Sequence, residues 1–254
     1  MTGKREALYK RLFEDLSDSA IENGFQLSPS IIMTDLELAV INACRSTFEG
    51  VESSVCYFHF SQCIWRKVQS YGLSARYNTD ASLRSKITYL FALPFLRPEK
   101  IPEASDEIKD SISIETAELS EWFDATFVRG KVRRLRNGTC VRSSPMFPPN
   151  LWSVHRCVLD RLPRTQNNVE AWRRRWENLV GRAHVGLHRM INEIRNEQRN
   201  VENRCERIRR GEKTTKKKQN RVRREEKLVE IINDRVSHPA IMDYLGAIAC
   251  NLPT

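Results

Sequence analysis

The sequence predicts an α/β core that is interrupted by an all-helical insertion and followed by basic C-terminal helices. Three observations support this fold class. Helix-like and strand-like patterns alternate over residues 4–71, helical periodicity continues over residues 78–127, and basic residues concentrate from residue 129 onward. The segments between the strand-like runs are long enough for parallel pairing. We therefore expect the strands of the core to pair in parallel.

Four elements carry the α/β prediction. Residues 4–22 have their apolar side chains on one face and predict an amphipathic helix. The β-branched run that follows predicts a buried strand ending at Asp35, and residues 51–58 predict a second strand. Residues 36–48 and 61–71 have apolar residues at helical spacing, so a helix follows each strand.

The rest of the chain has no convincing strand. Prolines divide residues 78–127 into short helical pieces, which predicts an all-helical insertion. Residues 129–142 carry six basic residues and no acid, and we expect a basic loop or ribbon there. Helices are predicted over residues 168–180 and 187–210, and a basic low-complexity stretch follows at 213–224.

The composition is that of a globular protein, with 254 residues, 40% hydrophobic and 29% charged. The longest apolar stretch, residues 89–96, is far shorter than the roughly 18 residues of a membrane-spanning helix, so no membrane span is expected. The N-terminus does not have the pattern of a secretory signal. Seven widely spaced cysteines indicate reduced thiols in the cytosol or nucleus.

The charge is divided unevenly along the chain. Residues 1–128 hold 13 Lys+Arg and 19 Asp+Glu, a net charge of −6, whereas residues 129–254 hold 29 and 13, a net charge of +16. Clustered cations gain free energy by displacing counterions from phosphates, so DNA is the expected partner. A solvated basic helix face with no partner is the alternative. The candidate nucleic-acid-binding residues are Arg129, Lys131, Arg133, Arg134, Arg136, Lys216, Lys217, Lys218, Arg221, Arg223 and Arg224.

Asp35 is the first candidate for chemistry. It ends a predicted strand, and open α/β sheets hold their ligands at that edge. Phosphoryl transfer by two metal ions needs several acidic oxygens that converge on one point, so Asp35 is a candidate metal ligand. Its alternative role is to cap the helix that begins at Leu36.

Cys56 and His59 form a Cys-x-x-His pair, and Cys63 lies one helical turn beyond. Zinc is one interpretation, but a structural zinc site needs four ligands and the sequence offers no second pair at suitable spacing. The alternative is a buried cysteine beside a hydrogen-bonded histidine. Trp152, in a proline-rich segment, is expected in the core, with base stacking as its alternative role.

Four short motifs occur in an order that resembles one known family. They are Met-Thr-Asp-Leu-Glu-Leu-Ala at 33–39, Cys-Tyr-Phe-His-Phe-Ser-Gln at 56–62, Phe-Pro-Pro-Asn-Leu-Trp at 147–152 and Arg-Thr-Gln-Asn-Asn-Val-Glu-Ala-Trp at 164–172. Together, with a helical insertion in the gap, they resemble Mutator-like element (MULE) transposases. The resemblance runs from Thr2 to about Arg210.

The resemblance implies an RNase H-like domain in which two Asp and one Glu hold two divalent ions, Mg²⁺ or Mn²⁺, for DNA strand cleavage and joining. Asp35 matches the second acid, Glu170 the third, and His59 a histidine near the active site. By this analogy residues 1–76 are a partial RNase H-like core and 77–150 the helical insertion with its basic loop. Residues 151–186 then return to the core with the last acid, and 187–254 form the basic helical C-terminal region.

Two departures from the family pattern affect the predicted activity. The first acid lies upstream of the region that Thr2 matches, and Arg173 stands where the family often has a histidine. We therefore expect a truncated transposase that binds DNA without full catalysis. A domesticated, non-catalytic nucleic-acid-binding or regulatory protein is the alternative, and a mispredicted gene start is a third. A homo-oligomer is also considered, and basic clusters between Arg207 and Arg224 predict nuclear localisation.

Overall fold

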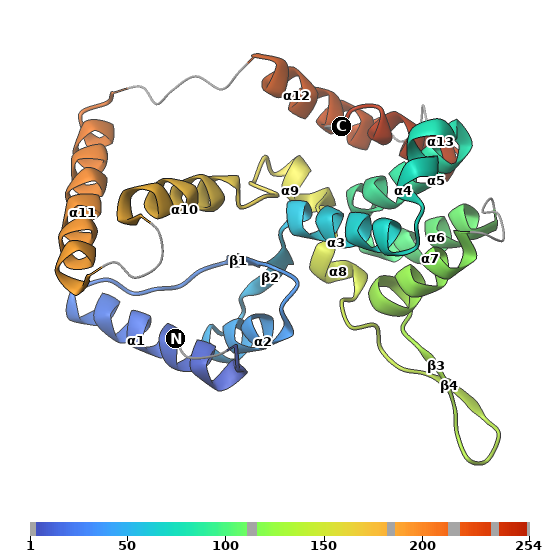
Figure 1. Cartoon of the computed structure of the whole chain (residues 1–254), viewed down its shortest axis with the longest axis horizontal. Coiled ribbons are helices and arrows are strands. Elements are labelled where there is room, and N and C mark those ends of the chain that lie inside the picture. Colours follow the sequence, from blue (N-terminus) through green and yellow to red (C-terminus); the bar gives the residue numbers. More distant parts are fainter. Residues whose placement is uncertain (1–3, 111–115, 182–185, 213–218, 235–238, 253–254) are drawn as a thin grey trace. The chain divides into compact units, whose positions relative to one another are not determined.

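The computed structural model divides the chain into two units (Figure 1). It describes residues 4–110, 116–181, 186–212, 219–234 and 239–252. The first unit contains residues 1–165 and 224–254, and the second contains residues 166–223. None of the helices in these described ranges is long and apolar enough to cross a membrane.

The first unit begins with two strands that alternate with helices. The order is α1 (Glu6–Glu22), β1 (Ile31–Thr34), α2 (Leu38–Thr47), β2 (Glu52–Val55) and α3 (Tyr57–Ser70). The strands β1 and β2 pair in parallel, with Ile31 opposite Glu52 and Thr34 opposite Val55. The two strands therefore end side by side, and the residues that follow each of them are brought together.

Helices make up most of the remainder of this unit. They are α4 (Ser74–Thr79), α5 (Ala81–Ala92), α6 (Ile101–Asp110), α7 (Ala117–Phe123), α8 (Pro149–Trp152), α9 (His155–Leu159), α12 (Gln219–Asn233, which begins in the second unit) and α13 (Ile241–Ala249). The carboxylate of Asp80 caps α5 by accepting hydrogen bonds from the backbone N–H groups of Ser82 and Leu83. Short helical turns at 93–95, 98–100 and 124–128 connect the longer helices.

The hydrophobic core joins segments that are far apart in the sequence. Helix α13 packs against α5 and α6, and the hydroxyl of its buried Tyr244 donates to the carbonyl oxygen of Phe95 at 2.9 Å. Leu228, Ile231 and Ile232 bring one face of α12 into the same core. The helices at the C-terminal end are therefore structural parts of the first unit.

The second unit consists of two helices, α10 (Asn167–Val180) and α11 (Leu187–Arg209), and the start of α12. The indole N–H of Trp172 on α10 donates to Glu197 on α11 at 2.7 Å, and Arg175 pairs with the same carboxylate. Trp172 also stacks on Trp176, with ring centroids 5.7 Å apart. These contacts fix one face of α11 against α10.

The α/β class predicted from the sequence is wrong. Of the described residues 69% are helical, and each of the two sheets has only two strands, so the chain does not form a clear RNase H-like core. The predicted strand at 51–58 is extended only over Glu52–Val55, because Tyr57, Phe60, Ile64 and Val68 are buried at helical spacing and extend α3 toward the N-terminus. Among the described residues beyond α3, the one further pair of strands is the hairpin of β3 (Val132–Arg134) and β4 (Cys140–Arg142).

Candidate functional site

Asp35 and His59 lie together at the ends of the parallel strands. Nδ1 of His59 is 2.7 Å from Oδ1 of Asp35, and the Asp35 side chain is 54% exposed against 19% for His59. The pairing of the strands produces this contact, because the N–H of Cys56 donates to the carbonyl oxygen of Thr34 at 2.8 Å. The first turn of α3 is thereby placed beside the end of β1.

Neighbouring contacts hold this edge of the molecule in place. Glu37, two residues beyond Asp35, accepts a hydrogen bond from the hydroxyl of Tyr9 at 2.8 Å. The same carboxylate forms an ion pair with Lys4 at 3.3 Å. The two contacts tie α1 and the segment just before it to the turn between β1 and α2. The Asp35–His59 pair is thus partly exposed at an edge that these contacts hold in place.

All four sequence motifs meet around α3, the first of them through the contact of Asp35 with His59. Phe60 stacks on Trp152 with ring centroids 4.7 Å apart and an interplanar angle of 16°, and the N–H of Tyr57 donates to the carbonyl oxygen of Arg164 at 2.9 Å. Trp152 is fully buried, and its indole N–H lies 3.0 Å from the carbonyl oxygens of Phe127 and Phe147. The core interpretation of Trp152 is therefore confirmed, and base stacking is not its role.

The hydroxyl of Tyr57 is also structural. It donates to the carbonyl oxygen of Phe91 at 2.9 Å, and burial raises the pKa of Tyr57 to about 12. Arg164, in turn, pairs with both carboxylate oxygens of Glu225 on α12. These contacts hold Tyr57 and Arg164 to the core. Neither side chain is therefore available for proton transfer.

Glu170 lies in the other unit. It occupies the first turn of α10, where the helix dipole stabilises an acid. The structure thus brings Asp35 together with His59, whereas Glu170 belongs to a unit separate from both.

The predicted ions, Mg²⁺ or Mn²⁺, need more ligands than this pair supplies. In the described ranges no group of three or more His, Cys, Asp or Glu side chains is arranged to hold a metal ion. Two ions held about 3.5–4 Å apart require several carboxylate oxygens, and Asp35 and His59 contribute one carboxylate and one imidazole. The residues placed at this edge therefore do not fit a two-ion site.

Zinc ligation by the Cys-x-x-His segment meets a similar difficulty. Cys56 is buried and Cys63 is half-buried. Burial raises the pKa of the Cys63 thiol, which disfavours the thiolate that zinc requires.

The segment 129–142 forms the β3–β4 hairpin, and its base is held by a partly buried carboxylate. Asp124 pairs through Oδ1 with Arg129 at 2.8 Å and through Oδ2 with Arg142 at 2.8 Å. Arg129 also pairs with Asp106 at 2.5 Å and donates to the carbonyl oxygen of Pro102. Burial alone would lower the pKa of Arg129, but its bonds to Asp106 and Asp124 raise it. Two of the six basic residues therefore anchor the hairpin.

The other four basic residues lie on the hairpin arm, which we define as residues 131–141. Lys131, Arg133, Arg134 and Arg136 are all exposed. In the described part of the chain no carboxylate lies within ion-pair distance of any of them. The arm thus presents four cations to solvent without an acidic partner.

Glycines at two places shape the hairpin. At Gly130 the backbone has φ +88°, and an added Cβ would lie 1.8 Å from the carbonyl oxygen of Ser143. Gly138, with φ +85°, is in the turn that reverses the arm, where the N–H of Leu135 donates to the carbonyl oxygen of Thr139. The dipeptide Asn137-Gly138 is a strong hairpin signal that the sequence analysis did not use.

The other predicted DNA-binding residues are only partly described. Lys216, Lys217 and Lys218 lie outside the described residues, as does the side chain of Arg221. Arg223 and Arg224 are exposed within α12.

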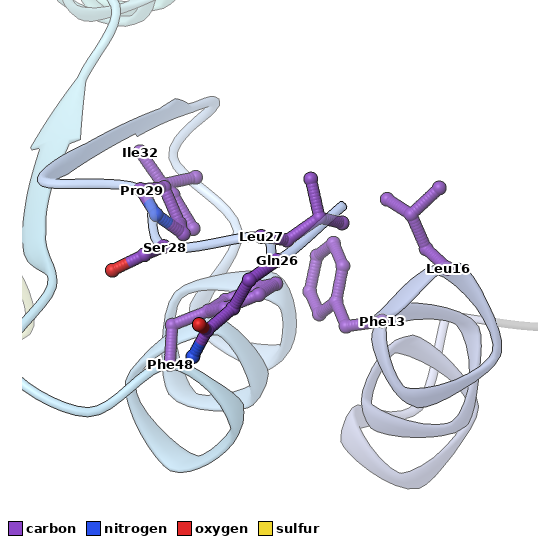
Figure 2. A pocket seen from close by; sticks show the side chains of 8 residues that line it. All are labelled: Phe13, Leu16, Gln26, Leu27, Ser28, Pro29, Ile32 and Phe48. Carbon is purple, nitrogen blue, oxygen red and sulfur yellow. The ribbon is translucent and has the colours of Figure 1, made fainter. Parts of the chain in front are cut away.

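An apolar pocket of 450 Å³ lies elsewhere in the first unit (Figure 2). It is lined by Phe13, Leu16, Gln26, Leu27, Ser28, Pro29, Ile32 and Phe48. Phe13 of α1 contacts Phe48, with ring centroids 5.7 Å apart. Because no lining side chain is ionisable, the pocket offers no acid, base or charged ligand for chemistry.

No family model, no curated protein and no solved structure matches this chain.

Proposed function

We propose that this chain binds DNA through phosphate contacts made by the hairpin arm, with little sequence preference. The observation that carries the proposal is the division of the basic residues in segment 129–142. Arg129 and Arg142 are neutralised by Asp106 and Asp124, whereas the four cations of the arm have no such partner. Unpaired surface cations repel one another, and a row of phosphates relieves that repulsion.

The geometry of the arm suits a nucleic acid. A two-stranded β-ribbon fits the major groove of duplex DNA, and basic side chains along it reach the flanking phosphates. The base of the arm is fixed by ion pairs and by the close approach at Gly130, so little freedom is lost on binding.

The overall charge supports the same partner. Residues 166–223 hold 17 Lys+Arg and 7 Asp+Glu, a net charge of +10, and the rest of the chain holds 25 of each. The hairpin arm is thus a local basic region in a unit that is neutral as a whole, and the second unit adds a general attraction to polyanions.

We further propose that the chain is related to MULE-type transposases, or is a domesticated relative of them, and has this DNA-binding role. The four ordered motifs support this, together with the contacts that join them around α3. Nuclear localisation is part of the same proposal.

The test compares two variants that lose the same charge. Arg133, Arg134 and Arg136 are changed to Ala in one variant. In the control Arg11, Arg76 and Arg156, which are exposed and already paired with carboxylates, are changed to Ala. The arm variant is expected to bind a mixed-sequence 20-base-pair duplex at least about tenfold more weakly than the control, as measured by fluorescence anisotropy. Equal affinities of the two variants would contradict the proposal.

A further inference from the structure

Exposed apolar side chains recur at every seventh residue of α11. Leu187, Ile194, Val201 and Ile208 are 73%, 51%, 50% and 52% exposed. Residues seven apart lie on the same side of a helix, so these four side chains form one row. A helix that is otherwise strongly polar thus carries an uncovered apolar row along its whole length.

A second row runs beside the first. Ile191, Gln198 and Cys205 follow the members of the first row by four residues, and all three are exposed. Together the two rows have the alternating spacing of four and three residues that defines a coiled-coil seam. We call these two rows the α11 seam. The central residue of its second row, Gln198, is polar.

Helix α10 does not cover this seam. It contacts α11 through the buried Glu197, which accepts a hydrogen bond from Trp172 and forms an ion pair with Arg175. Glu197 lies next to Gln198 around the helix, so α10 flanks one side of the seam. On the other side of the seam lie Arg195 and Glu202.

We propose that the α11 seam binds the α11 seam of a second copy of this chain, with the two helices antiparallel. The charges beside the seam select both the partner and the direction. In a parallel pair, Arg204 would face Arg209 of the second copy, so like charges would meet.

In an antiparallel pair with Gln198 opposite Val201, these flanking charges become complementary. Arg195 then faces Glu202 of the second copy. The same register places Ile191 opposite Ile208 and Ile194 opposite Cys205. Twofold symmetry makes every one of these contacts twice, which is the condition for a closed dimer.

The length of the helix is sufficient for this contact. The 23 residues of α11 span about 34 Å, a little more than three heptads. This proposal is independent of DNA binding by the hairpin arm, which belongs to the other unit.

Charge exchange tests the proposed direction. The variants Arg195→Glu and Glu202→Arg each place like charges opposite each other and are expected to weaken dimerisation at least about tenfold, as measured by sedimentation equilibrium. The double variant restores opposite charges and is expected to restore the dimer. Arg199→Glu, on the side of α11 away from the seam, is the control and is expected to leave the dimer unchanged. Circular dichroism checks that every variant keeps its helix content.

Crosslinking tests the register. In a background with the exposed residues changed by Cys140→Ser and Cys250→Ser, Ile194→Cys is expected to give an intermolecular disulfide with Cys205 on mild oxidation. The same background without Ile194→Cys is expected to stay uncrosslinked, because in the antiparallel register the two copies of Cys205 are about 16 Å apart. A monomer at all concentrations, no rescue by the double charge variant, or a disulfide between the two native Cys205 residues would each overturn the proposal.

Discussion

Arg142 reaches from the second strand of the hairpin to Asp124, with its Nη1 2.8 Å from Oδ2 of that carboxylate. Asp124 follows α7 directly and is nearly buried, so the ion pair fixes the base of the arm to the helical body. The remaining cations of the arm extend from this fixed base. Arg129 and Arg142 thus hold the structure, whereas Lys131, Arg133, Arg134 and Arg136 are the exposed residues that we propose bind DNA.

The substitution Asp124→Asn distinguishes the effect of holding the hairpin arm in position from the effect of net charge on DNA binding. The substitution makes the chain more positive, which on charge alone would tighten DNA binding. We expect the opposite, a loss of roughly 1 kcal/mol or about fivefold in Kd, because two weakened ion pairs release the base of the arm. Asp15→Asn on exposed α1 makes the same charge change without touching the hairpin and serves as the control. Tighter binding by Asp124→Asn would show that the base does not position the arm.

Gly130→Ala tests the close approach at the base of the hairpin. Both Gly130 and Gly138 have positive φ, but only at Gly130 would an added Cβ meet a backbone atom, the carbonyl oxygen of Ser143 at 1.8 Å. Gly138→Ala is expected to lower the free energy of unfolding by about 1 kcal/mol through backbone strain, and Gly130→Ala by clearly more. Urea denaturation of the two variants measures the difference. Equal losses would mean that the hairpin base is open enough for a side chain.

Phe60 and Phe58 form a matched pair on α3. Phe60 is fully buried against Trp152, whereas Phe58 is 46% exposed. We expect Phe60→Ala to lower the free energy of unfolding by about 3–5 kcal/mol, since it removes a stacked ring from a packed core. Phe58→Ala is expected to cost less than about 1 kcal/mol. Similar costs in denaturant unfolding would contradict the assignment of this face of α3 to the core.

His155 predicts the pH dependence of stability. Burial, with a smaller contribution from Arg97, lowers its pKa from the ordinary 6.5. The unfolded chain then binds more protons than the folded chain at pH values around and below 6.5, so stability falls as the pH is lowered through this window. His155→Gln is expected to reduce this fall in thermal unfolding measured from pH 7.5 to pH 5. If the stability of the variant falls by the same amount, a group other than His155 causes the pH dependence.

Helical periodicity predicted several elements closely. The expected helices at 4–22, 168–180 and 187–210 correspond to α1, α10 and α11 within about two residues at each end. Their apolar residues repeat with the helical period over several turns, and this pattern can be read from the sequence without knowing any distant contact. The predicted fold class was wrong because a short apolar run such as 51–58 is compatible with a strand and also with the start of a buried helix.

The contacts of the site could be predicted only in part. Asp35 was placed correctly at a strand end, but its contact with His59 depends on the register of β1 against β2, which a single sequence does not specify. Asp124 was missed because nothing local distinguishes it from other acids. Its role follows from the arginines that fold back onto it.

The salt dependence of DNA binding tests the central claim most directly. Each phosphate contact contributes roughly −0.9 to the slope of log affinity against log salt concentration. Changing Arg133, Arg134 and Arg136 to Ala is therefore expected to flatten the slope by about 2–3, whereas the charge-matched control at Arg11, Arg76 and Arg156 keeps the slope of the unmodified chain. A weaker affinity with an unchanged slope, or the same flattening in both variants, would contradict a phosphate-binding hairpin arm.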